Sequence, residues 1–168
     1  MAQDDTPPTP STGNGGIGEP GGPPQLIINA QYVKDLSFEN PRAPQSLIQQ
    51  KAQPEVALDI DVKATNLAPD LFEVMLTISA EAKTEGEAVF IVQVTYAGVI
   101  TVKNATGDML TGLVFVETPR LLFPFARNVI ATATRDGGFP PLLINPVDFT
   151  ALLRREQAKA AGAQTATA

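Results

Sequence analysis

The side chains that could take part in chemistry are mainly closely spaced carboxylates. Asp59 with Asp61, and Glu85 with Glu87, have an i, i+2 spacing that could serve acid–base catalysis or hold a metal ion. On an extended strand this spacing puts both carboxylates on one face, and a solvated acidic surface is the favoured interpretation. The chain contains no histidine and no cysteine. Imidazole bases, thiolate nucleophiles and Cys/His zinc sites are therefore excluded, and we expect neither a metal ion nor a cofactor.

Two further features lack the context that their chemistry requires. Residues 13–18 read GNGGIG, a literal G-x-G-x-x-G, but no strand precedes them and no helix follows to present amides to a pyrophosphate. The serines have no histidine to activate a hydroxyl. We therefore expect that the protein is not an enzyme. A small-molecule enzyme with a closed pocket of converging polar groups is the alternative from another functional class.

Composition and charge limit the partners and the location of the protein. The chain has 168 residues, of which 43% are hydrophobic, enough for one domain. Its net charge of −6 is uneven, because residues 1–117 carry 15 acids and 6 bases while residues 118–168 carry 3 acids and 6 bases. An acidic surface repels nucleic acid and favours basic partners. No apolar stretch approaches the roughly 20 residues that span a bilayer, and no signal peptide is evident, so we expect a cytoplasmic protein without membrane insertion.

The two ends of the chain differ from its centre. Residues 1–24 are rich in proline, glycine and polar residues, and we expect them to be disordered. Residues 157–168 are small and polar and predict a flexible tail. The single folded domain is expected over residues 25–156.

Four segments have the character of strands, at residues 26–39, 55–62, 71–83 and 89–102. The second and third alternate apolar and polar residues at period two and flank a turn at residues 66–70, which predicts an antiparallel hairpin with one wet face. Residues 40–54 are predicted to form a long surface loop. The first segment is predicted to place one apolar set on a single face: Leu26, Ile28, Tyr32, Leu36 and Phe38.

After Thr118-Pro119 the apolar spacing becomes three and four, which predicts a long helix. Pro124 lies either in its first turn or at a kink. The helix is expected to end at Asp136, where the following glycines can adopt the left-handed cap, and a short helix is expected from about Asp148 to Ala158. The predicted fold is α+β, with a four-stranded antiparallel sheet followed by one long and one short helix.

The long helix is apolar around most of its circumference, and such a helix is buried on several sides. The most economical second cover in so short a chain is another copy, so we predict a homo-oligomer. The alternative is burial of the helix within its own monomer. The helix residues predicted at the subunit interface are Leu122, Phe125 and Val129.

Apolar side chains also occur where loops are predicted, in the 40–54 loop and in residues 139–144, which read FPPLLI. Most would anchor the loops to the core, but a loop edged by apolar side chains beside a helix can instead form an open groove. Such a groove suits an extended apolar peptide segment. The candidate binding residues are Leu47, Ile48, Phe139, Leu142, Phe149 and Leu152.

Five runs occur in a characteristic order: YVKDLSFENP at residues 32–41, QPEV at 53–56, PRLLFPFAR at 119–127, GFPP at 138–141 and NPVDF at 145–149. With these runs in register, the chain resembles the SecB family of bacterial protein-export chaperones over about residues 26–155. The resemblance implies an α+β subunit that assembles as a homotetramer, a dimer of dimers. It also implies ATP-independent binding of unfolded secretory precursor proteins, which are kept translocation-competent and passed to the SecA motor. A general antiaggregation or toxin–antitoxin chaperone on the same scaffold is the alternative.

The resemblance also assigns roles by position. It implies that the basic, zinc-bearing tail of SecA docks at Asp35, Glu39, Ile91 and Gln93, and that Val92, Val94 and Tyr96 serve assembly. The chain departs from the family pattern at Gln93, where an acid is usual, and at Ala52, where a tryptophan often precedes QPEV. The first departure removes one charge from the implied docking surface.

Overall fold

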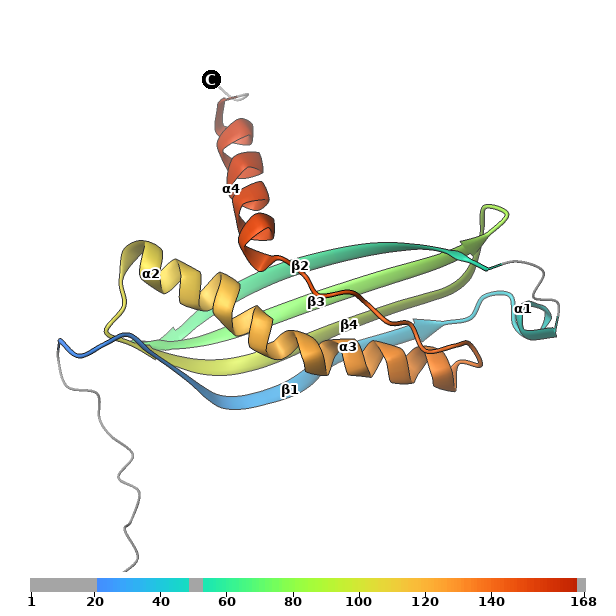
Figure 1. The fold of residues 1–168 in the computed structure, drawn as a ribbon, viewed down its shortest axis with the longest axis horizontal. Helices are drawn as coiled ribbons and strands as arrows, with labels where there is room; N and C mark the ends of the chain where they lie inside the picture. The colour runs from blue at the N-terminus through green and yellow to red at the C-terminus, as the bar shows by residue number, and fades with distance from the viewer. Residues whose placement is uncertain (1–20, 49–52, 166–168) are drawn as a thin grey trace, which may run out of the picture.

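The computed structural model describes residues 21–48 and 53–165 and confirms the predicted α+β class. One sheet carries a long helical segment across one of its faces, and a second helix projects past the edge of the sheet (Figure 1). The predicted disordered residues 1–20 lie outside the described residues, as do residues 49–52, which include Ala52, and residues 166–168.

The sheet contains four antiparallel strands in the order β1-β4-β3-β2, so β1 and β2 form its two edges. Consecutive strands β2, β3 and β4 are joined as hairpins, and the connection from β1 to β2 links the two edge strands. Each strand is longer than its alternation alone indicated. The bounds are Gln25–Glu39 for β1, Glu55–Ala68 for β2, Leu71–Thr84 for β3 and Glu87–Lys103 for β4.

β1 departs from the predicted alternation because it contains two bulges. Its pairing with β4 shifts by one residue at Asn29 and again at Lys34, and each extra residue reverses the faces of the side chains that follow. Tyr32 pairs with Ala97 and therefore lies on the face opposite Leu26, Ile28, Leu36 and Phe38. The prediction for Tyr32 was wrong because simple alternation does not reveal a bulge.

The loop between β1 and β2 contains one turn of helix, α1 (Gln45–Ile48), which the sequence analysis did not predict. The turn is closed by backbone hydrogen bonds from the Leu47 and Ile48 amides to the Pro44 carbonyl, at 3.0 and 3.3 Å. α1 lies at the end of the sheet where β1 stops and β2 begins (Figure 1).

The long helical segment starts at Gly107, twelve residues before the predicted start at Pro119. It consists of α2 (Gly107–Gly112), a π-helical stretch η1 (Leu113–Glu117) and α3 (Thr118–Asp136). The π turn precedes Pro119, which has no amide hydrogen to donate. Thr118 donates to the Leu113 carbonyl through both its amide and its hydroxyl, the latter at 2.8 Å. Pro119 thus lies inside a continuous helical segment rather than at its start.

The end of α3 confirms the predicted glycine stop. The Gly137 and Gly138 amides donate to carbonyls of the last turn, and Gly138 has a φ of +91° that favours glycine. Residues 139–148, here named the crossing loop, then lead back across the sheet to α4 (Phe149–Thr165). α4 is longer than the predicted short helix and includes residues 157–165, which were assigned to a flexible tail.

The core lies between the sheet and the long helical segment. The side chains of β3 and β4 that face the helices are fully buried, while those on the other face are partly exposed. The buried set includes Val74, Leu76, Ile78, Val92, Val94, Ile100, Leu122 and Ile130.

By length and composition, residues Gly107–Asp136 would also be able to cross a membrane, which was not expected from the sequence. Its buried inner side identifies this segment as the core helix of the fold.

Candidate functional site

The four residues assigned to docking lie together on the face of the sheet that no helix covers, here named the open face. The antiparallel register places Glu39 opposite Ile91 and Ser37 opposite Gln93. Asp35 follows opposite Thr95, so the two carboxylates flank the row that contains Gln93. Asp35 and Glu39 are exposed, and Ile91 and Gln93 are half-buried. The structure thus brings together residues that are more than 50 positions apart in the sequence.

The centre of this surface is polar but uncharged. Ser79 donates a 3.0 Å hydrogen bond to the Gln93 side-chain carbonyl, and the hydroxyls of Thr77 and Thr95 are 3.1 Å apart. Acids outnumber bases around these residues. By strand register, the open face carries Asp35, Glu39, Glu55, Asp59, Asp61, Glu73 and Glu81 against Lys34, Lys63, Lys83 and Lys103. The open face is therefore suited to a basic partner.

A three-residue cluster bridges β1 and β3 over the intervening strand β4. The Lys34 ammonium lies 2.7 and 2.9 Å from the two carboxylate oxygens of Glu73, and the Tyr32 hydroxyl donates to the same carboxylate. These hydrogen bonds, that of Lys34 first, hold the pKa of Glu73 below its usual value. The hydrogen bond to Glu73 also raises the pKa of Tyr32. This cluster was not predicted, because Tyr32 and Lys34 reach Glu73 only through the two bulges of β1.

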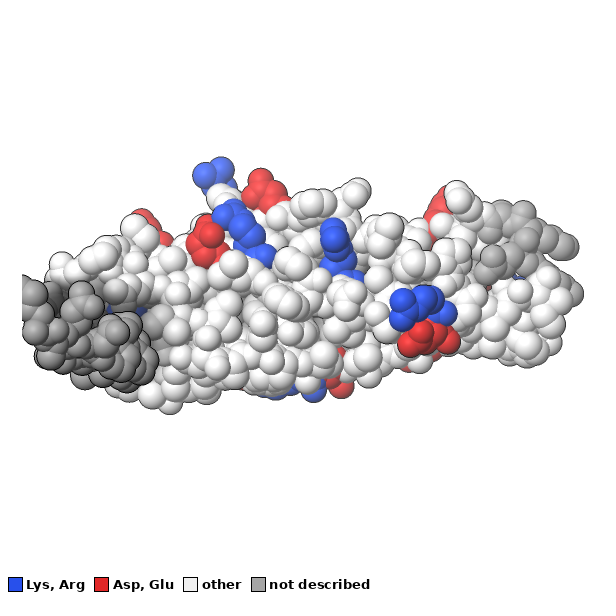
Figure 2. All heavy atoms as spheres, turned by 60° about the horizontal axis from the view of Figure 1, so that its bottom comes forward, with Lys and Arg blue, Asp and Glu red and all other residues white. Residues whose placement is uncertain are grey.

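The opposite side of the molecule is mainly apolar. Figure 2 looks onto the β1 edge and the long helix, and most of that side is free of charged side chains. Large apolar side chains are exposed there although the core is otherwise well packed. They are Val33 and Leu36 on β1, and Leu121 and Phe125 on α3. Exposed apolar surface of this kind is typical of sites that bind another protein, a membrane or a ligand.

The structure corrects half of the predicted subunit interface. Val92 and Val94 on β4 and Leu122 on the inner side of α3 are fully buried within their own chain, so they have no surface to offer another subunit. Tyr96 is almost fully buried and stacks on Phe125, with ring centroids 6.1 Å apart. Of the six residues, Phe125 is exposed and Val129 is half-buried. Burial inside the monomer was the alternative for the apolar helix, and it holds for its inner side.

The candidate residues for binding an apolar peptide also divide into two groups. Leu47 and Ile48 on α1 are exposed, and Leu142 and Leu152 are half-buried. Phe139 and Phe149 are instead core residues, because Phe139 packs on Phe90 at 5.0 Å and Phe149 on Phe123 at 6.0 Å between ring centroids. They are therefore not available to a peptide in this conformation. Leu143, which was not selected, is the most exposed large apolar side chain of the crossing loop, at 75%.

Two buried or partly buried polar contacts hold the crossing loop against α3. The Leu142 amide donates to the Thr134 hydroxyl at 2.9 Å, and Arg127 donates to the Ile144 carbonyl at 3.4 Å. The Thr134 hydroxyl donates in turn to helix carbonyls at Ile130 and Ala131. Thr134 is fully buried. No sequence signal distinguishes this threonine from others at helical spacing.

The glycines that end α3 allow α1 and the end of β1 to approach closely. A Cβ on Gly137 would lie 2.2 Å from the Phe38 ring, and one on Gly138 would lie 2.9 Å from the Leu47 side chain. The Asn40 amide donates to the Gly137 carbonyl at 3.3 Å and accepts a hydrogen bond from Ser46 at 3.0 Å. The exposed apolar residues of α1 are thus placed beside the crossing loop.

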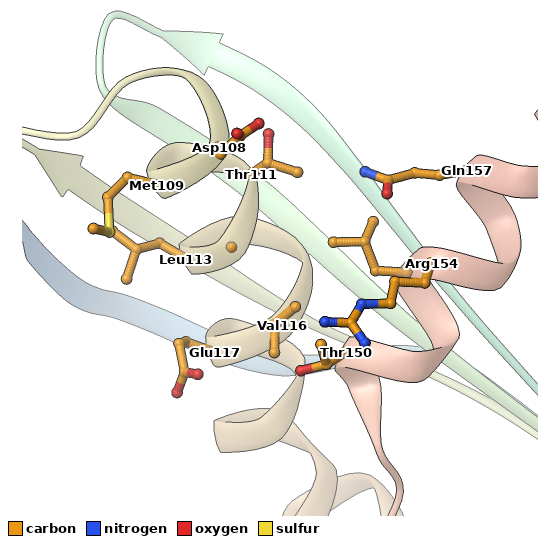
Figure 3. A pocket seen from close by; sticks show the side chains of 11 residues that line it. Asp108, Met109, Thr111, Leu113, Val116, Glu117, Thr150, Arg154 and Gln157 are labelled. Atoms are coloured by element: carbon orange, nitrogen blue, oxygen red, sulfur yellow. The ribbon is translucent and has the colours of Figure 1, made fainter.

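A groove separates α4 from the α2–η1 segment, with a volume of about 740 Å³ (Figure 3). The Arg154 side chain points from α4 toward η1, and Leu113, Val116 and Leu153 are among the apolar lining residues. A smaller groove of about 320 Å³ lies between Ile60 on β2 and Leu152 on α4. Both grooves are open surface features, unlike a closed pocket of converging polar groups.

Within residues 21–48 and 53–165, no group of three or more acidic side chains could hold a metal ion.

A solved structure has a similar fold. The SecB-like chaperone Rv1957 of Mycobacterium tuberculosis, in complex with a peptide from the antitoxin HigA1, matches with a TM-score of 0.57. The match covers 73% of this chain and 90% of that one at 17% sequence identity. This similarity supports the α+β fold. At this sequence identity it does not establish a shared function.

The sequence comparisons identify those relatives. The family model described as preprotein translocase subunit SecB matches residues 20–160. The protein-export protein SecB of Afipia carboxidovorans is 52% identical over 87% of this chain and 91% of its own length. That of Bradyrhizobium diazoefficiens is 50% identical over 94% of this chain and 99% of its own length. The resemblance in the five sequence runs is therefore confirmed, and the chain belongs to the SecB family.

Proposed function

We propose that the chain is an ATP-independent chaperone that binds unfolded secretory precursor proteins in the cytoplasm and delivers them to SecA for export. The observation that carries this proposal is the division of the molecule into two surfaces. Asp35 and Glu39 stand on the acidic open face, whereas Leu47, Ile48 and Leu143 are exposed at the end of the sheet and on the crossing loop. A client and a basic partner can therefore bind the same subunit without competing.

Client binding rests on exposed apolar surface rather than on a shaped pocket. Each well-buried apolar side chain contributes on the order of 1.5–3 kcal/mol before ordering costs, so a few contacts suffice for reversible binding. The test is suppression of aggregation of a chemically denatured precursor at subunit ratios near stoichiometric. Suppression supports the proposed chaperone activity, and failure to suppress aggregation at every ratio would contradict it.

Docking of SecA rests on the carboxylates beside Gln93. Reversing both charges, with Asp35→Lys and Glu39→Lys, is expected to raise the Kd for SecA by about tenfold or more. The matched control reverses Asp59 and Asp61, which lie on the same face but on the far edge strand β2. Equal losses in both variants would mean that net charge, and not this site, attracts SecA.

We further propose a homotetramer, a dimer of dimers, in which the apolar side formed by β1 and α3 is covered. The unpaired edge of β1 and the exposed Leu36, Leu121 and Phe125 support a contact between copies. Solution mass tests this assembly. A tetramer that dissociates on Leu121→Arg with Phe125→Arg supports the proposal, and a stable wild-type monomer contradicts it.

A second candidate function is general antiaggregation or toxin–antitoxin control on the same scaffold. The similar fold of Rv1957, solved with an antitoxin peptide, is the observation that favours considering it. Crosslinking of clients in cells separates the two functions. Secretory precursors as the main clients support export, whereas cytoplasmic proteins or one antitoxin support the alternative. Neither function requires binding to nucleic acid or insertion into a membrane.

A further inference from the structure

Both bulges of β1 are fixed by a side-chain contact on the open face. Asn29, the extra residue of the first bulge, donates to the Thr101 hydroxyl at 2.8 Å. Lys34, the extra residue of the second bulge, is paired with Glu73 at 2.7 Å. The Glu73 side chain is only 13% exposed, so this ion pair is better sheltered than the other ion pairs on strands β2 and β3.

An alternative register without bulges is available to β1. If the Ile28–Ile100 pairing simply continued, Lys34 would stand opposite Val94 and Ser37 opposite Ile91. Leu36 and Phe38 would keep their buried face, because two bulges together shift the pairing by two residues. The burial of these two apolar residues therefore does not distinguish the registers. The registers differ in the faces of residues 30–34, and the largest difference is at Lys34, whose charge would turn toward the helix-covered side next to a fully buried valine.

The register decides the shape of the docking surface. In the observed register, Asp35 and Glu39 stand two residues to either side of Ser37, which faces Gln93. In the alternative, Asp35 would face Gln93 and Glu39 would face Val89 at the end of the strand. The spacing of the carboxylates relative to Ile91 and Gln93 would be lost.

We propose that the Lys34–Glu73 ion pair selects the double-bulge register of β1, and that Lys34 and Glu73 thereby act as positioning residues for the docking surface. The effect of the ion pair on the register of β1 does not depend on the proposed function, whereas its effect on docking rests on that function. Tyr32 adds to the same contact, because the first bulge turns it to the open face, where its hydroxyl donates to Glu73.

Disulfide trapping reads the register directly, since the chain has no native cysteine. Ser37→Cys with Gln93→Cys places cysteines directly opposite each other in the observed register, and Ser37→Cys with Ile91→Cys does so only in the alternative. In the wild-type background we expect the first pair to crosslink and the second to remain largely reduced. With Lys34→Met and Glu73→Gln together, the crosslinked ratio of the second pair to the first is expected to rise at least roughly threefold.

Two further variants serve as controls. Lys63→Met with Asp61→Asn removes an exposed ion pair of the same face and should leave the ratio unchanged. The exchanged pair Lys34→Glu with Glu73→Lys should restore the wild-type ratio. An unchanged ratio in the Lys34→Met, Glu73→Gln variant, or an exchange that fails to restore it, overturns the inference. If that variant does not fold, the exchanged pair alone decides between the two outcomes.

Binding of SecA to the cysteine-free variants separates this inference from the proposed function. A changed register with a Kd for SecA raised about tenfold supports both, because charged contacts are then misplaced. If the register changes but SecA binding does not, Lys34 and Glu73 still position β1 in the sheet, and the proposed docking surface is contradicted. Weaker SecA binding without a change of register contradicts the positioning role.

Discussion

The two faces of the sheet differ in how tightly their side chains are constrained. On the helix-covered face, the inner residues of β3 and β4 are fully buried and packed against α3. On the open face, the same strands carry serine, threonine and acidic side chains that are partly exposed. Stability is therefore concentrated on one face, and the other is free to present charge to a partner.

The largest expected effect comes from disrupting the packing on the helix-covered face of the sheet. Leu122→Ala removes a fully buried side chain beneath the helix and is expected to lower the free energy of unfolding by about 2–5 kcal/mol. Its neighbour Leu121 is 47% exposed, and Leu121→Ala should cost about 0.5 kcal/mol or less within one subunit. Denaturant unfolding at low protein concentration measures both. Similar losses would contradict the assignment of inner and outer helix sides.

A second expected effect concerns the apolar surface at α1. Leu47→Ser with Ile48→Ser should weaken binding of an unfolded precursor several-fold, since two exposed apolar contacts are lost. Leu67, equally exposed at the β2–β3 turn, provides the control as Leu67→Ser. Titration of a fluorescently labelled precursor measures the Kd. An equal loss with the control would show that clients bind any exposed apolar residue.

A smaller effect is expected at the centre of the open face. Gln93→Glu adds a carboxylate between Asp35 and Glu39. The added negative charge should tighten binding of the basic SecA tail a few-fold and make the Kd more sensitive to salt. Binding measured at two ionic strengths checks this, and a weaker complex would mean that SecA needs the amide that accepts from Ser79.

The smallest expected effect is a pH dependence at Glu73. Its pKa is lowered in the folded chain by Lys34 and Tyr32, so the stabilisation is present above the unfolded pKa and is lost as pH falls through the folded value. Glu73→Gln should therefore be less stable than the wild type near pH 7, and the difference should shrink in acid. Thermal unfolding between pH 7 and 3 measures it. A difference that grows in acid would contradict the assigned ion pair.

The sequence predicted the parts of this fold that depend on local pattern. Alternation in β3 identified its buried side chains, and glycines after Asp136 located the end of α3. The helix start predicted after Thr118-Pro119 was wrong, because a π turn before the proline joins α2 to α3 in one helical segment. The face of Tyr32 was wrong because the bulges depend on partners in β3 and β4. The first error concerns a contact within the helix, and the second concerns pairing between strands distant in sequence.

The candidate site shows the same difference between what local sequence pattern predicts and what it does not. Resemblance placed Asp35, Glu39, Ile91 and Gln93, and the strand register brings them together on one face. Composition alone identified apolar loop residues but not which of them turn inward, as Phe139 does by packing on Phe90. Periodicity likewise marked the helix as apolar without separating Leu122 from Leu121.

The separation of the two surfaces is tested most directly by measuring the Kd of SecA for the chain with and without a saturating unfolded precursor. The open face and the apolar side predict that both ligands bind together, so that the precursor does not weaken SecA binding and a ternary complex is seen by solution mass. Displacement of SecA by the precursor would contradict this, because it would mean that both ligands occupy one surface.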